Sequence, residues 1–138
     1  MMAKRQVGAL PYRIRKGGVE ILLVTTRGKK RWFIPKGWPM KGRKLRAAAA
    51  IEAFEEAGVK GRIRRRAIGD FAHEKRIGGR NVACEITLYP LAVKRNLKKW
   101  PERSERKRQW FKGRKAIRKV TAKGVRRAIT RLTRKHED

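Results

Sequence analysis

The composition of the chain predicts one domain in a reducing compartment. It has 138 residues, of which 40% are apolar, enough for a single hydrophobic core over residues 1–138. No apolar run approaches the ~20 residues that a membrane helix requires, and none of signal-peptide length follows the basic N-terminus. The single cysteine, Cys84, excludes an internal disulfide. We therefore expect a cytoplasmic protein without a membrane partner.

Basic residues dominate the charge of the chain. Lysine and arginine number 41 against 11 aspartates and glutamates, for a net charge of +30. Such an excess repels itself and attracts polyanions, among them nucleic acid, polyphosphate, anionic lipid and phosphorylated small molecules. Composition does not choose between these partners, and it fits a generally basic surface equally well.

The pattern of the first third of the chain predicts strands. Val7–Ile14 and Val19–Thr26 flank a Lys-Gly-Gly turn and predict an antiparallel hairpin. Pro11 cannot donate to a strand ladder, so it predicts an edge or a bulge in the first strand. Arg31–Ile34 predicts a further short strand that ends at Pro35.

A helix is predicted over Leu45–Ala57, which is rich in alanine and ends before Gly58, a residue suited to a helix C-terminus. More strands are expected afterwards: Gly61–Ile68, Phe71–Arg76 and Val82–Val93. Two shorter segments follow, an apolar one at Trp110-Phe111 and a helical turn at Arg114–Lys119.

Apolar residues at helical spacing predict a last helix, which Thr121 would cap. They are Val125, Ala128, Ile129 and Leu132. The order strands, helix, strands, helix predicts an α/β or α+β fold, with a mixed sheet between helices.

Three of the few acidic residues share one face of the first helix. Glu52, Glu55 and Glu56 are three and four positions apart, so their carboxylates converge. Clustered carboxylates repel one another, and hard cations such as Mg²⁺ and Mn²⁺ prefer oxygen ligands. The cluster therefore predicts a divalent-metal site. The alternative is an exposed helix face whose glutamates pair with nearby arginines.

Residues Gly37 to Val59 resemble the Nudix box, G-x5-E-x7-R-E-U-x-E-E-x-G-U, where U is apolar. Gly37, Glu52, the pair Glu55-Glu56 and Gly58 match it without a gap. Two positions depart from the pattern: Arg43 replaces the first Glu and Ile51 replaces the Arg. In the family that Arg orients the glutamates and the first Glu assists the metal, so these changes predict a site weakened by ~10–100-fold.

The resemblance extends to Val7–Arg13, Arg31–Gly37, Trp100–Arg103 and Trp110-Phe111, which look like the diphosphoinositol polyphosphate phosphohydrolase-like branch. It implies an α/β/α sandwich and a metal-dependent pyrophosphohydrolase. The implied substrates include nucleoside diphosphate-linked compounds, dinucleoside polyphosphates, diphosphoinositol polyphosphates and capped RNA.

Site roles follow from the same resemblance. Glu55 and Glu56 would bind Mg²⁺ or Mn²⁺ beside the backbone carbonyl of Lys36, and Glu52 would be a ligand or the general base. A further carboxylate from outside the box is expected, with Glu85 as the first candidate and Glu74 as the second. Substrate would lie near six residues of the loops: Arg31, Lys36, Gly37, Trp38, Arg76 and Arg80, the Trp stacking on a base.

A competing hypothesis is a basic nucleic-acid-binding module on a Nudix scaffold, with weak or no catalysis. Residues 106–135 contain no acidic residue. The last helix would present a basic face to phosphates through Lys123, Arg126, Arg127, Arg131 and Arg134. Binding of this kind would fall with salt and need no metal, whereas hydrolysis would require metal. The sequence carries no expectation of oligomeric state.

Overall fold

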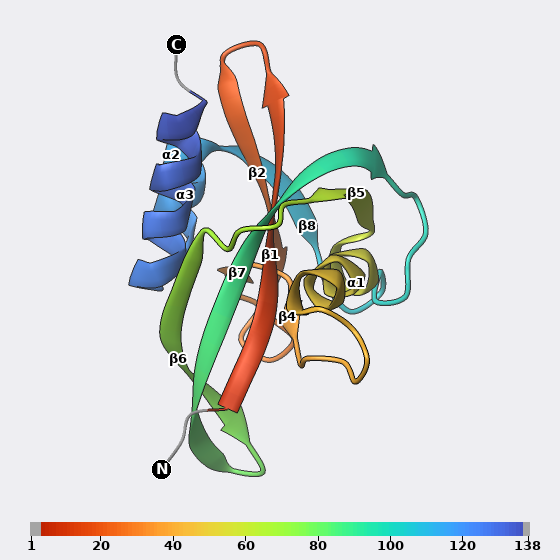
Figure 1. Cartoon of the computed structure of the whole chain (residues 1–138), viewed down its shortest axis with the longest axis vertical. Coiled ribbons are helices and arrows are strands. Elements are labelled where there is room, and N and C mark those ends of the chain that lie inside the picture. Colours follow the sequence, from red (N-terminus) through yellow and green to blue (C-terminus); the bar gives the residue numbers. More distant parts are fainter. Residues whose placement is uncertain (1–3, 137–138) are drawn as a thin grey trace.

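A mixed sheet of eight strands lies between one helix on one face and two helices on the other (Figure 1). The computed structural model describes residues 4–136. Its helices are α1 (Leu45–Ala57), α2 (Gly113–Lys119) and α3 (Lys123–Lys135). The strands are β1 (Lys4–Arg15), β2 (Gly18–Thr25), β3 (Trp32–Phe33), β4 (Lys36–Gly37), β5 (Val59–Ile63), β6 (Gly69–Ile77), β7 (Arg80–Asn96) and β8 (Arg108–Lys112). The predicted α+β fold with helices on both sides of the sheet is confirmed.

Strand β1 is the centre of the sheet. It pairs antiparallel with β2 through Tyr12↔Ile21, which confirms the predicted hairpin, and parallel with β7 through Val7↔Thr87. Strands β5 and β6 pair with β7, β3 and β8 pair with β2, and β4 pairs with β1. The short strand β4 therefore lies directly beside β1.

The expectation that Pro11 marks an edge or a bulge is wrong, because β1 has a neighbour on each side. On one side of β1, Gly8 pairs with Lys36 of β4. Further along the same side, pairing resumes where Tyr12 meets Ile21 of β2. The amide of Ala9 points to that side and donates to the carbonyl of Pro35 at 3.0 Å. Amides two residues apart point the same way, so the missing N–H of Pro11 falls in the gap between β4 and β2.

The helices follow the apolar pattern of the sequence. Helix α1 has the predicted bounds, and Gly58 closes it in the left-handed conformation with φ 65°. Helix α3 buries the predicted residues, but its N-cap is Ala122 and not Thr121. The strand expected over 61–68 is shorter than predicted, because β5 ends at Ile63 and residues 64–68 form a loop.

Two apolar clusters hold the layers together. One packs α2 and α3 on the sheet through Leu10, Phe33 and Leu88, and the other packs α1 on the opposite face through Val7 and Leu91. Helix α1 contributes only small residues to its cluster: Ala48, Ala49, Ala53 and Ala57. Because alanine is small, the helix axis can lie close to the sheet, and this brings its glutamates near β4.

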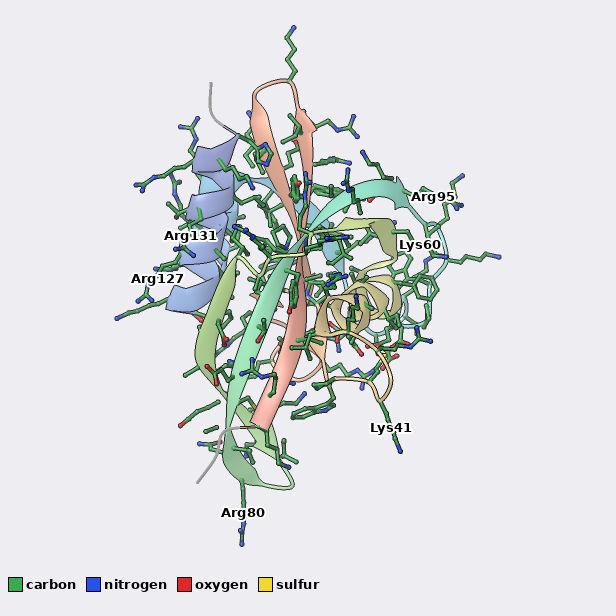
Figure 2. All side chains as sticks on the ribbon, in the orientation of Figure 1. Lys41, Lys60, Arg80, Arg95, Arg127 and Arg131 are labelled. Atoms are coloured by element: carbon green, nitrogen blue, oxygen red, sulfur yellow. The ribbon has the colours of Figure 1, made fainter. Side chains whose placement is uncertain are left out.

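Basic side chains cover the outside of the molecule. In Figure 2, Lys41 and Arg80 extend outward from different parts of the chain. Among residues 4–136, the ion pairs engage only four arginines: Arg5, Arg13, Arg27 and Arg106. Most cations of that part of the chain therefore have no acidic partner. None of its helices is long and apolar enough to cross a membrane.

Candidate functional site

Strand β4 and helix α1 bring Gly37 against Glu52. The pair Val7↔Gly37 fixes β4 on the central strand, and the α1 side of Gly37 is occupied by the Glu52 carboxylate. A Cβ atom at position 37 would overlap all three atoms of that carboxylate group. Glycine is therefore required here by close approach, since φ at this residue is not positive.

Glu56 lies one helical turn further along α1 and is 6% exposed. Its Oε1 accepts a 3.4 Å hydrogen bond from the backbone N–H of Lys36. Its Oε2 lies 3.4 Å from a terminal nitrogen of Arg106. Strand β4 and a distant arginine together hold this carboxylate in place.

The electrostatics of the two glutamates are unusual for carboxyl groups. Burial raises the pKa of Glu52 to about 7, with further increases from the charges of Glu56, Glu55 and Glu102. Burial also raises the pKa of Glu56 to about 7, although Arg106 and Lys36 act in the opposite direction. Both groups are thus partly protonated near neutral pH, and a nearby cation would favour their charged forms.

Glu102 and Arg106 complete a group that we call the carboxylate corner: Glu52, Glu55, Glu56, Glu102 and Arg106. The Nε of Arg106 donates to Glu102 at 2.9 Å, and its Nη1 donates to the carbonyl of Thr25 at 3.1 Å. The backbone N–H of Glu102 donates to the carbonyl of Glu55 at 3.0 Å, which ties the loop to α1.

Sequence reasoning missed both Glu102 and Arg106. A signal was present, because Glu102 belongs to the Trp100–Arg103 segment that resembles the family. The carboxylate from outside the box was instead expected at Glu85 or Glu74. Glu85 pairs with Arg5 at 3.6 Å, and neither it nor Glu74 is among the main charges that raise the pKa of Glu52 or Glu56.

The two residues that differ from the Nudix box, Arg43 and Ile51, lie in different surroundings. Arg43 is exposed in the turn before α1, where its amide donates to the carbonyl of Met40. Ile51 lines a shallow hollow with Phe54 and Leu91, on the side of α1 that meets β5. The buried guanidinium beside Glu56 comes from Arg106, far along the chain.

Lys36 has its side chain on the opposite face of β4 from Glu52, since its neighbour Gly37 faces α1. Its Nζ lies 5.7 Å from the centre of the Phe33 ring, which stacks on His73. Burial lowers the pKa of Lys36, and the charge of Lys75 adds to that effect. The half-exposed Trp38 follows, with the Lys75 ammonium 5.6 Å from its ring.

The other residues predicted to contact substrate are dispersed. Arg31 lies in the turn after β2, where its N–H donates to Thr26 Oγ1 at 3.0 Å. Arg76 donates to Asn81 at 3.3 Å near the end of the β6–β7 hairpin. Arg80 projects from the tip of that hairpin, away from the rest of the molecule (Figure 2). The structure therefore brings the backbone of Lys36 and Gly37 beside α1, but not these arginines.

Within residues 4–136, no three His, Cys, Asp or Glu side chains form a preassembled metal site. The donors at the carboxylate corner nevertheless suit a hard divalent cation. They are oxygen atoms of Glu52 and Glu56, close to the backbone of Lys36 and Gly37. Burial has raised the pKa of both carboxyl groups, with smaller increases from Glu56 on Glu52 and from Glu102 on Glu56, and a bound cation would relieve this penalty.

Comparisons with known proteins show which proteins the chain resembles. No protein-family model matches the chain. Diphosphoinositol polyphosphate phosphohydrolase 3-beta of Bos taurus is 32% identical over 83% of this chain and 67% of its own length. Nudix hydrolase 12, mitochondrial, of Arabidopsis thaliana is 28% identical over 95% of this chain and 73% of its own length. A crystal structure of a C. elegans Ap4A hydrolase superposes with a TM-score of 0.70 at 19% identity, covering 96% of each chain.

The fold, the box and the relatives agree on one class of protein. The chain belongs to the Nudix hydrolase family. It spans between 53% and 73% of the length of the Arabidopsis Nudix hydrolases that it matches.

Proposed function

We propose that the chain hydrolyses a phosphoanhydride bond in an anionic, phosphorylated small molecule, in the cytoplasm. Substrates of this kind are nucleoside diphosphate-linked compounds, dinucleoside polyphosphates and diphosphoinositol polyphosphates. The last two classes are supported by the names of a relative and of a structural neighbour. The observation that carries the proposal is the carboxylate corner, where the half-buried Glu52 and the buried Glu56 both have a pKa of about 7.

The cofactor in this proposal is Mg²⁺ or Mn²⁺. Glu55 and Glu56 would hold it together with the backbone carbonyl of Lys36, and Glu52 would lie beside it. A bound divalent cation would neutralise the oxygens of the pyrophosphate and promote attack by water. Arg106 and the Lys36 N–H fix the position of the Glu56 carboxylate, so the corner is organised before any ligand arrives.

A side chain of the protein would accept the proton of the attacking water. The Glu52 pKa of about 7 suits a general base at neutral pH, since the group is partly ionised and still a good proton acceptor. Glu52 would take the proton of the attacking water while the water oxygen bonds to phosphorus. The bridging P–O bond then breaks, and the leaving phosphate carries away the electron pair.

Substrate contacts are proposed at the edge of the corner. The exposed ring of Trp38 lies next to Gly37 in the chain and would meet a base, whereas the Lys36 side chain, on the opposite face of β4, would contribute only its positive charge. A high positive charge over the whole surface would also raise the local concentration of an anionic substrate.

The test is phosphate release from a panel of these substrates with Mg²⁺ and with Mn²⁺. We expect metal-dependent turnover that falls by about 100-fold or more in Glu52→Gln and in Glu56→Gln. Glu105→Gln is the matched control, because within residues 4–136 this exposed carboxylate forms its one ion pair with Arg27. Turnover that survives both substitutions, in variants that fold normally, would exclude the carboxylate corner as the catalytic site.

A second function, nonspecific nucleic-acid binding, is supported by the outer face of α3. Arg127, Arg131 and Arg134 are exposed there, and no acidic residue pairs with them in residues 4–136. Binding to an oligonucleotide should weaken steeply as salt is raised and should not change on chelation of divalent metal. Metal-dependent or salt-independent binding would contradict this second function.

A further inference from the structure

A hollow lined by arginine lies outside the carboxylate corner. It has a volume of about 660 Å³ and is formed by the β5–β6 loop, the C-terminal turn of α3 and the first turn of α1. Its basic lining consists of Arg62, Arg64, Arg65, Arg66, Arg131 and Lys135, with Arg46 at the rim on α1. We call this the arginine hollow.

Neutral acceptors hold two of these guanidinium groups in place. Arg64 donates to the hydroxyl of Tyr12 twice, from Nε at 3.2 Å and from Nη2 at 3.0 Å. Arg131 donates from Nη1 to the carbonyl of Ile68 at 3.1 Å. A guanidinium has five N–H groups, so each keeps donors for a ligand. Their orientation is already fixed, which lowers the entropy cost of binding.

The positive charge of the hollow is uncompensated. The ion pairs of residues 4–136 engage none of its arginines, and none of the lining residues is acidic. Concentrating this many cations around one concavity is unfavourable without an anion.

The hollow is separate from the carboxylate corner. Tyr12, at its floor, lies five residues along β1 from Val7, which pairs with Gly37, and this corresponds to ~16 Å at about 3.3 Å per residue. The two sites also use different faces of the sheet. Tyr12 belongs to the apolar cluster under α2 and α3, whereas Gly37 faces α1.

We propose that the arginine hollow binds a compact oligophosphate anion, one that carries three or more phosphate groups on a short chain or a small ring. Phosphate oxygens match the fork of N–H groups that arginine presents. The concave shape of the hollow favours a compact anion over an extended nucleic acid. Its one aromatic pair, Tyr12 and His136, is packed ring to ring at 5.4 Å with Tyr12 buried, so it does not form an open platform for bases.

The test measures binding of inorganic tripolyphosphate by calorimetry, with a chelator present so that the carboxylate corner holds no metal. Wild type is compared with Arg65→Ala/Arg66→Ala, because both residues line the hollow and make no hydrogen bond in the structure. We expect about tenfold weaker binding or more in this variant. Lys98→Ala/Lys99→Ala removes the same charge from an exposed loop outside the hollow and should change affinity by about twofold or less.

A second variant tests whether the fixed orientation of Arg64 contributes to binding. Tyr12→Phe keeps the ring that packs in the core but removes the hydroxyl that orients Arg64. We expect tripolyphosphate affinity to fall by about threefold, at unchanged net charge. Tyr89→Phe is the control, since Tyr89 is buried in the cluster under α1.

Three results would overturn the proposal. Equal losses in the two double variants would mean that tripolyphosphate binds the diffuse charge of the surface. An unchanged affinity in Arg65→Ala/Arg66→Ala, with normal melting, would remove the hollow as its site. Tighter binding of a short oligo(dT) than of tripolyphosphate, lost in the same variant, would assign the hollow to nucleic acid.

Discussion

The carboxylate corner and the arginine hollow arrange charge in opposite ways. In the corner, scarce acidic groups are buried beside one arginine, and burial moves the pKa of Glu52 and Glu56 to about 7. In the hollow, basic groups stay open to solvent and are held by neutral oxygens such as Tyr12 Oη. Buried like charges tune protonation and suit chemistry, whereas exposed and oriented like charges suit binding of an oppositely charged ligand. The predictions below test each half of this contrast.

The largest loss of activity is expected from a substitution that crowds the carboxylate corner. Gly37→Ala would place a Cβ atom on the Glu52 carboxylate and displace it from β4. We expect metal affinity and hydrolysis to fall by about 10–100-fold. Gly28→Ala is the control, because a Cβ there meets nothing within 4 Å and the residue has no positive φ. Equal activity in the two variants would show that close approach at position 37 is not needed.

The next effect comes from the buried cation. Arg106→Met removes the arginine that pairs with Glu56 and one of the two arginines that pair with Glu102. We expect unfolding free energy to fall by about 3–5 kcal/mol, as for other broken buried pairs. The acidic limb of the pH–rate profile should also move to higher pH, because Arg106 lowers the pKa of Glu56. Arg103→Met, an exposed neighbour, should change neither quantity; a loss of stability without the pH shift would limit Arg106 to a structural role.

The third prediction concerns the protons that Glu52 and Glu56 release when a metal binds. Carboxyl groups with a pKa of about 7 hold protons below that pH and must release them before a divalent cation binds. Affinity for Mn²⁺ should therefore rise with pH up to about 7, by at most about tenfold per unit for each group, and then level off. Calorimetry in buffers of different ionisation enthalpy would count the protons. Affinity that is constant between pH 5 and 7, as expected for ordinary glutamates, would contradict the raised pKa values.

The smallest effect tests whether the two regions are independent. Arg65→Ala/Arg66→Ala should leave hydrolysis unchanged and unfolding free energy within about 0.5 kcal/mol of wild type, because both side chains are exposed and unpaired. Chemical denaturation and the phosphate-release assay measure both quantities. A large loss of turnover would mean that the hollow contributes to the same reaction as the corner.

Local physics alone determined several parts of this protein. Alanine-rich composition and a closing glycine were enough for the bounds of Leu45–Ala57, since both act within one turn of helix. Helical spacing was enough to place Glu52, Glu55 and Glu56 on one face, and the box that contains them predicted the family.

Only the tertiary structure decided what surrounds these elements. The central strand can contain Pro11 because its missing N–H falls in the gap between β4 and β2, where no strand needs that donor. Arg106 reaches Glu56 from fifty residues away in the chain. The arginines of the β5–β6 loop become a binding hollow only because α3 returns beside them. Contacts between such distant segments depend on how the whole sheet is ordered, which no local pattern encodes.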